Sequence, residues 1–234
     1  MTDATRLAFA ADALRRSPLF TSLSDARLEE LSRAFRPRRY RRGEVIFHRG
    51  DVGDTLHLIE SGLVKISEES LAGSEAFINT LHAGAAFGEL GLIDGAERSA
   101  TATALEPTIT LVLPRAPVIA LIDNDPAFRH ALLAAMANEL RRVTGRLAEL
   151  HFLDLPGRLA VRLAGMAQEA EPGRNHDVRL GRAYTQSELA SMIGGTRQSV
   201  NRHLGELVAD GLIRLEPDDI VVIDVAELHG RGEW

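Results

Sequence analysis

The chain has no cysteine among its 234 residues. Disulfide bonds, thiol catalysis and an iron–sulfur cluster held by cysteine thiolates are therefore excluded. No apolar run approaches the ~20 residues that a membrane-spanning helix needs. The first residues contain no secretory hydrophobic segment, so we expect a cytoplasmic protein without a membrane partner. What remains is ordinary for a globular chain, with 45% hydrophobic and 26% charged residues.

An excess of positive charge is also missing, since the formal net charge is −6 at pH 7. Residues 155–234 contain nine arginines against twelve acidic residues. A strongly basic domain is the usual electrostatic signature of nucleic-acid binding. Any contact with DNA must therefore depend on a few well-placed cations rather than on bulk charge.

The most informative segment spans residues 87–101, with the sequence FGELGLIDGAERSAT. Gly88 lets the backbone come close to a ligand, and Glu89 can accept hydrogen bonds from ribose hydroxyls. Arg98 offers a planar fork to phosphate oxygens, and Ser99 adds a hydroxyl. The set suits a molecule that combines a sugar with an anionic phosphate.

Hydrophobic spacing predicts helices within residues 5–35 and then a run of short strands between residues 38 and 117. Ser24 is expected to cap the second helix. Turn signals separate the strands, and Leu90 to Leu92 can form one helical turn whose N–H groups face an anion. Many short strands at this spacing predict a sandwich or small barrel. The expected strands are 45–47, 55–59, 63–66, 76–81, 100–105 and 109–113.

A long helix is predicted over residues 126–154, with Asp125 as its cap and Pro126 as its first residue. Its apolar residues alternate at spacings of three and four, the pattern of a two-stranded coiled coil. A core helix of a globular domain can show the same pattern, but this helix is unusually long and lies between two domains. We therefore expect a homodimer seam formed by Leu133, Met136, Leu140, Val143, Leu147 and Leu150. We expect a hinge at residues 154–157.

Residues 185–210 have the spacing of a helix-turn-helix. Small Ala190 allows close helix packing, Gly194-Gly195 makes the turn, and Thr196 caps the second helix. That helix is expected to bury an apolar face and to present a polar face on its other side. The expected buried residues are Val200, Leu204, Leu207 and Val208, and the expected polar face contains Gln198, Asn201, Arg202 and Gly205. A hairpin over residues 212–223 completes a predicted winged helix.

These motifs, in this order, closely resemble the Crp/Fnr family of bacterial transcription regulators. The resemblance implies an α+β fold with a cyclic-nucleotide-binding β-roll (a double-stranded β-helix) in residues 1–125. A dimerisation helix then spans residues 126–154, and a winged helix-turn-helix spans residues 155–234. It further implies no enzymatic activity, a homodimer, a near-palindromic DNA target of two half-sites, and RNA polymerase as a further partner.

The same resemblance assigns roles to individual residues. Glu89 would bind the ribose 2′-hydroxyl, and Arg98 and Ser99 the cyclic phosphate, with main-chain groups near Gly88, Leu90 and Ala100 assisting. Val143 and Thr144 stand where the family places two hydroxyl side chains that reach adenine, and valine cannot make that bond. The implied effector is cAMP or a related cyclic nucleotide, with no metal or iron–sulfur cluster. The implied DNA contacts are Gln186, Thr196, Arg197, Gln198, Ser199, Asn201 and Arg202.

Three other hypotheses stay open at this point. The regulator could act without a cyclic nucleotide, or it could respond to cyclic di-GMP or another anion. An enzyme of the cupin type is suggested faintly by His57 and Glu60, although the paired His-x-His motif is missing. A nucleotide-binding module of a channel or enzyme would need a membrane segment or a catalytic domain, and neither remains once the helix-turn-helix is assigned.

Overall fold

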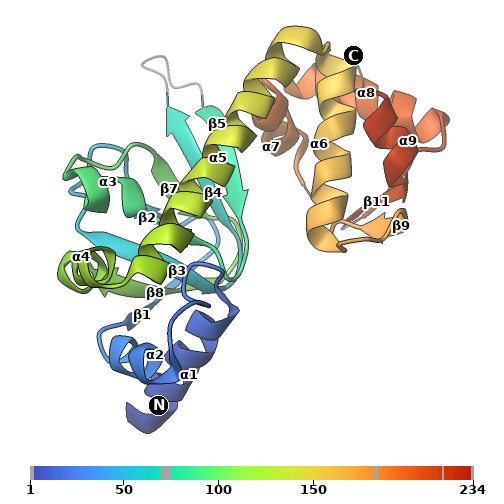
Figure 1. The fold of residues 1–234 in the computed structure, drawn as a ribbon. Helices are drawn as coiled ribbons and strands as arrows, with labels where there is room; N and C mark the ends of the chain where they lie inside the picture. Colours follow the sequence, from blue (N-terminus) through green and yellow to red (C-terminus); the bar gives the residue numbers. More distant parts are fainter. Residues whose placement is uncertain (1–2, 70–74, 182–183, 218, 233–234) are drawn as a thin grey trace. The chain divides into compact units, whose positions relative to one another are not determined.

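The structure, a computed structural model, describes residues 3–69, 75–181, 184–217 and 219–232 (Figure 1). The chain forms two compact units, residues 1–140 and 141–234, and each is described separately below. A single helix, α5 (Pro126–Phe152), begins in the first unit and ends in the second.

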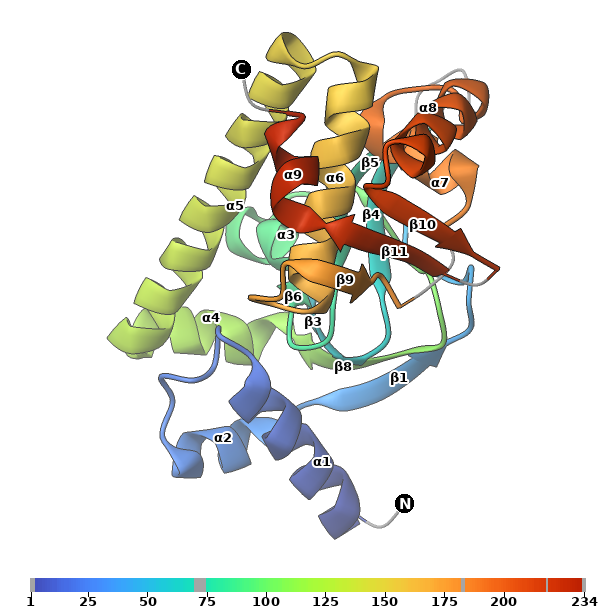
Figure 2. The same ribbon diagram turned by 90° about the vertical axis from the view of Figure 1, so that its right-hand side faces the viewer.

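The first unit contains two four-stranded antiparallel sheets (Figures 1 and 2). One has the strand order β1-β8-β3-β6 and the other the order β2-β7-β4-β5. The strands are β1 (Arg36–Tyr40), β2 (Val45–Phe47), β3 (Thr55–Ser61), β4 (Val64–Glu69), β5 (Glu75–Leu81), β6 (Ala86–Phe87), β7 (Thr101–Ala104) and β8 (Thr108–Pro114). All six predicted strands are present, and the predicted β-roll is confirmed.

Four helices accompany these sheets: α1 (Asp3–Arg16), α2 (Asp25–Ser32), α3 (Glu89–Asp94) and α4 (Arg115–Asn124). Ser24 caps α2 as expected, because its side chain accepts a hydrogen bond from the Arg27 N–H. The main core of this unit joins the helices to the first sheet through Phe20, Phe35, Leu56, Leu111 and Phe128. A smaller cluster around Phe87 contains residues of both sheets.

Three elements of this unit were not predicted. Strand β1 has the sequence RPRRY, which shows no apolar alternation, and it forms because its main chain pairs with β8. Strand β6 has two residues, and α4 follows β8 directly. The two strands depend on pairing with β8 and β3, which a local sequence pattern does not show.

Helix α5 starts as expected, because the Phe128 N–H donates to the carboxylate of Asp125 over 2.9 Å. The helix ends at Phe152, two residues earlier than predicted. The predicted hinge at residues 154–157 needs a correction. Asp154 caps a new helix, α6 (Leu155–Ala170), by accepting a hydrogen bond from the Gly157 N–H over 3.0 Å. Pro156 and Gly157 therefore lie in the first turn of α6, where proline is well tolerated, and the break between the helices is Leu153-Asp154.

The seam residues of α5 are largely exposed in the single chain. The exposed fraction is 60% for Leu133, 68% for Leu140, 62% for Leu147 and 54% for Leu150. A row of exposed apolar side chains along one helix face is typical of an interaction surface. This exposure is consistent with the predicted dimer seam, which stays a prediction.

The second unit contains α6, β9 (His176–Arg179), α7 (Gln186–Ile193), α8 (Arg197–Ala209), β10 (Ile213–Glu216), β11 (Asp219–Asp224) and α9 (Val225–Gly230). The strands form one antiparallel sheet in the order β10-β11-β9. The predicted hairpin corresponds to β10 and β11, whereas β9 and α9 were not predicted. A shared core joins α6, α7, α8, α9 and the sheet, so the predicted winged helix-turn-helix is confirmed.

Candidate functional site

The candidate ligand site begins at the turn between β6 and α3. Gly88 has a left-handed backbone conformation with φ of 82°, which a side chain would strain. A Cβ atom at this position would also lie 2.5 Å from Nη1 of Arg98. Glycine is therefore required here both for the turn and for the approach of the guanidinium.

Arg98 is fixed by hydrogen bonds to groups far away in the sequence. Its Nη1 donates to the Gly88 carbonyl over 2.7 Å, and its Nη2 donates to the carbonyl and the hydroxyl of Thr55 over 2.8 Å each. The guanidinium carbon lies 4.2 Å from the centre of the Phe47 ring, a cation–π contact. These contacts hold the planar fork in one orientation.

Arg98 forms no ion pair with a carboxylate among the described residues, although the charges of Asp54, Glu89 and Asp51 act on it from farther away. The side chain is buried, with 5% exposed, and its Nε has no hydrogen-bond partner. Burial lowers the pKa of this arginine below its usual value. A buried cation without a directly paired anion is costly, so the site fits an anionic ligand that would pair with the guanidinium and accept a hydrogen bond from Nε.

Glu89 is the first residue of α3, and its carboxylate does not form an ion pair with Arg98. Burial raises the pKa of Glu89 above its ordinary value, and the charge of Glu139 adds to this rise, whereas a main-chain hydrogen bond and the charge of Arg98 oppose it. The acid and the guanidinium are thus separate groups in one site. An acceptor for hydroxyls and a donor fork for an anion are both available.

The other predicted ligand residues differ in how far they are exposed to solvent. Ala100 is buried, Ser99 is exposed, and Leu90 is 43% exposed. Val143 and Thr144 lie at exposed positions of α5 within the second unit. Their predicted role toward adenine therefore stays a prediction.

His57 belongs to this site, and sequence reasoning did not assign it there. Its ring stacks on Phe87 at 5.1 Å between centroids and lies 5.6 Å from Phe47. Nε2 lies 3.3 Å from the Thr55 hydroxyl, which also binds Arg98, and Nδ1 lies 3.4 Å from the Thr110 hydroxyl. The only signal in the sequence was a histidine at an inward-facing position of an apolar strand. No group of three or more potential metal ligands occurs in the described ranges, and the cupin hypothesis gains no support.

We predict that His57 makes the protein sensitive to acid. Burial, together with the positive charges of Arg98 and Arg38, lowers the pKa of His57 from 6.5 to about 3. Between these values the unfolded chain binds a proton that the folded chain does not. The free energy of unfolding should therefore decrease as the pH falls through this window, by up to about 1.4 kcal/mol per pH unit.

Urea titrations at a series of pH values measure this effect. His57→Gln, which keeps a polar side chain but cannot take up the proton, should show a shallower decrease than the wild type. Equal decreases in the two proteins would contradict the assignment.

The helix-turn-helix is held by local hydrogen bonds. Thr185 and Glu188 form a capping box at the start of α7, and Thr196 and Ser199 form one at the start of α8. Gly194 ends α7 with a left-handed φ of 67°. The hydroxyls of Thr196 and Ser199 are therefore already engaged in the cap, whereas both residues were predicted as DNA contacts.

The buried face of α8 differs from the prediction at one position. Val200, Leu204 and Leu207 are buried as expected, but Val208 is 41% exposed. His203 is buried instead, with 6% exposed. The prediction did not include His203, although its position three residues after Val200 falls on the same helix face.

The opposite face of α8 presents the predicted DNA-contacting side chains. Gln198, Asn201 and Arg202 are exposed there. The Gln186 amide donates to Asn201 over 2.8 Å, and Nε of Arg197 donates to Gln186 over 3.4 Å. Gln186 thus links the start of α7 to the face of α8 that would contact DNA.

Comparison with known proteins agrees with this arrangement. Residues 37–125 match the cyclic nucleotide-binding domain family, and residues 157–231 match the Crp-like helix-turn-helix domain family. A ligand-binding β-roll joined to a winged helix-turn-helix defines a DNA-binding transcription regulator. The chain is 30% identical over 221 residues to the CRP-like cAMP-activated global transcriptional regulator of Mycobacterium tuberculosis, covering 94% of this chain and 99% of that protein.

Further relatives point the same way. Identity to the Cyclic AMP receptor protein of Thermus thermophilus is 34% over 216 residues, which cover 92% of this chain and 97% of that protein. The crystal structure of the Thermus thermophilus catabolite activator protein matches with a TM-score of 0.52, covering 92% of this chain and 98% of that chain. FixK2 from Bradyrhizobium japonicum matches with a TM-score of 0.77 at 19% identity over 86% of this chain and 98% of that chain, which shows the fold alone. The chain belongs to the Crp/Fnr family of transcription regulators.

In the part of the chain that the structure describes, no helix has both the length and the hydropathy required to cross a bilayer.

Proposed function

We propose that this protein is a homodimeric, sequence-specific DNA-binding regulator controlled by a cyclic nucleotide, with cAMP as the favoured effector. The observation that supports the effector site most strongly is the buried guanidinium of Arg98, which forms no ion pair in the described residues and interacts electrostatically with the half-buried carboxylate of Glu89. A cyclic phosphate would neutralise Arg98, and a ribose hydroxyl would donate to Glu89.

The effector acts through its different affinity for two conformations of the regulator. In one conformation the paired helices α5 hold the two copies of α8 so that they fit half-sites one helical turn apart. The break at Leu153-Asp154, between α5 and α6, is the place where the chain can bend. A cytoplasmic location and a contact with RNA polymerase complete the proposal.

The choice of cAMP over other anions is supported by the relatives whose names state cAMP activation. Val143 weakens the case for a specific contact with the adenine amino group, because its side chain has no hydrogen-bonding atom. The proposal therefore depends on the phosphate and ribose contacts, whose protein groups are present, and not on a hydrogen bond from Val143 to the base.

Isothermal titration calorimetry with cAMP, cGMP, cyclic di-GMP and linear AMP tests the effector. We expect cAMP to bind at one molecule per chain with the highest affinity of the four. AMP should bind more weakly, since its open phosphate lacks the ring geometry that places phosphate and ribose together. Binding of cyclic di-GMP alone, or of none of the four, would contradict the proposal.

A further inference from the structure

Arg202, a candidate DNA-contacting residue of α8, has a defined set of partners in the same helix. Its Nη2 lies 3.1 Å from Nε2 of His203, and its Nε lies 3.9 Å from Oε1 of Glu206. The arginine side chain itself is 68% exposed. The guanidinium therefore has partners in α8 and is still open to solvent.

His203 is the buried member of this group. Its side chain is only 8% exposed, and its Nδ1 lies 2.6 Å from Oε2 of Glu206. Glu206 is 56% exposed and contacts both other residues. The three side chains form a chain of contacts from the buried side of α8 to the side that would contact DNA.

The hydrogen bonds of this group can run in only one direction. An arginine donates and never accepts, so Nε2 of His203 must be the acceptor and carry no proton. The ring proton is then on Nδ1, where it donates to the Glu206 carboxylate. Glu206 thus fixes the tautomer and the plane of the ring, and the ring in turn presents its lone pair to Arg202.

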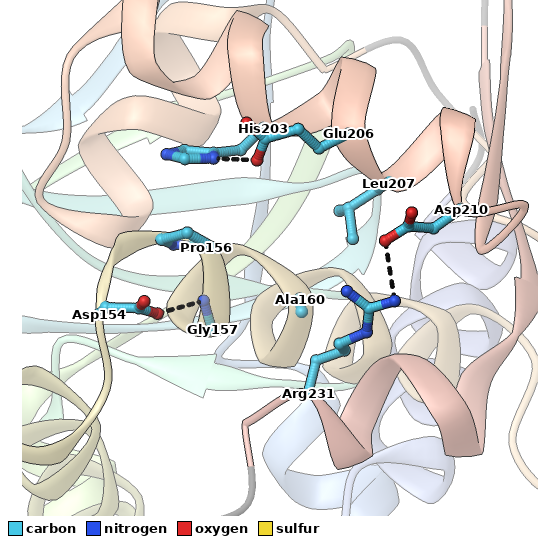
Figure 3. A pocket seen from close by; sticks show the side chains of 9 residues that line it. All are labelled: Asp154, Pro156, Gly157, Ala160, His203, Glu206, Leu207, Asp210 and Arg231. Carbon is cyan, nitrogen blue, oxygen red and sulfur yellow. Dashed lines mark hydrogen bonds and ion pairs between the residues drawn. The ribbon is translucent and has the colours of Figure 1, made fainter.

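His203 and Glu206 also lie beside the first turn of α6. His203 and Glu206 line a cavity of about 190 Å³ together with Asp154, Pro156 and Gly157, and Figure 3 shows the His203 ring and Pro156 on facing sides of it. Asp210 and Arg231 also line this cavity, and they form a separate ion pair over 2.8 Å. The charged residues that contact His203 are Arg202 and Glu206, and the other charged residues of the cavity lining are Asp154, Asp210 and Arg231.

We propose that His203, oriented by Glu206, is a positioning residue that directs Arg202 toward one base of each DNA half-site. The inference depends on the proposed function, in which α8 enters the major groove. A free arginine side chain loses rotamer freedom when it binds, and a preset orientation reduces that loss. A preset fork also favours bidentate contact with guanine O6 and N7 over looser contacts with other bases. His203 therefore determines specificity without touching DNA.

Selection from a random-sequence DNA library with the full-length protein tests this inference. Arg202→Ala first identifies the half-site position that Arg202 reads. His203→Asn removes the nitrogen that faces Arg202, and Glu206→Ala removes the orienting carboxylate from an exposed position without opening the core. Both should lower the base preference at that position by about tenfold, the size of one good side-chain–base contact, and leave the other positions unchanged.

Two controls separate positioning from a merely structural role. His203→Gln places an acceptor where Nε2 lies and should restore most of the preference. Asp210→Asn breaks the neighbouring ion pair on the same cavity and should leave the preference unchanged. Thermal unfolding shows whether each variant is folded.

The inference is overturned if folded His203→Asn and Glu206→Ala proteins keep the wild-type preference, or if all positions weaken equally. It is also overturned if Arg202→Ala changes no single position. Should the wild-type protein itself select no sequence, the proposed function fails, and the inference fails with it. The wild-type selection therefore distinguishes the two failures.

Discussion

Replacing Arg98 with glutamine is expected to lower the affinity for cAMP by roughly a hundredfold or more. The guanidinium is the buried cation that would pair with the phosphate, and removing one member of a buried charge pair leaves the other uncompensated. Glu89→Gln should lower the affinity by roughly tenfold, because a charged acceptor for the ribose hydroxyl becomes a neutral one. Calorimetry with cAMP measures both changes.

The two variants test the site by independent routes. Arg98 also bonds to the Gly88 and Thr55 carbonyls, so Arg98→Gln can weaken the fold as well as the site. Glu89→Gln leaves those bonds in place and removes a half-buried charge whose pKa is already raised. Glu97→Gln, an exposed carboxylate of the same segment, is the matched control and should bind cAMP like the wild type. The site assignment would be wrong if Arg98→Gln and Glu89→Gln both kept wild-type affinity while folded.

Placing glutamate at Leu140 and Leu147 together is expected to convert a dimer into a monomer. These two leucines are 68% and 62% exposed in the single chain, and each would stabilise a dimer by about 1.5–3 kcal/mol if fully buried against a partner. Facing glutamates would instead repel one another across the seam. Sedimentation equilibrium measures the mass, and binding to DNA with two half-sites should be lost together with the dimer.

Ala135→Glu provides the matched control for this experiment. Ala135 is exposed on the same helix but lies outside the apolar seam, so its substitution should leave the mass at that of the dimer. A double variant with the same mass as the wild type would contradict the predicted seam. So would a wild-type protein that sediments as a monomer.

Much of the architecture could be predicted because the spacing of apolar residues indicates which side chains are buried. The alternating strands 45–47 and 109–113, the cap at Asp125 and the Gly194 turn follow from local chemistry, and the structure has them where expected. Strand β1 could not be predicted, because its arginines give no pattern and its place depends on pairing with β8. The start of α6 was misassigned because Pro156 suggests a break, whereas Asp154 caps a helix that accepts proline in its first turn.

The candidate site likewise contains residues that the sequence could predict and residues that it could not. Glu89 and Arg98 could be found from one short segment of sequence, since their chemistry suits a ribose and a phosphate. Their surroundings could not, because Thr55 and Phe47 reach Arg98 only after the two sheets have formed. His57 likewise gains its place from the rings of Phe47 and Phe87. Contacts between residues far apart in the sequence leave no local pattern.

The affinity of the wild-type protein for a selected DNA site, measured by fluorescence anisotropy with and without saturating cAMP, tests the coupling of effector to DNA most directly. We predict tighter DNA binding with cAMP by a factor of about 5–150, the usual range of coupling between two sites. The affinity for cAMP must then rise by the same factor when DNA is present, because coupling is reciprocal. Equal DNA affinity in the two conditions would contradict the account.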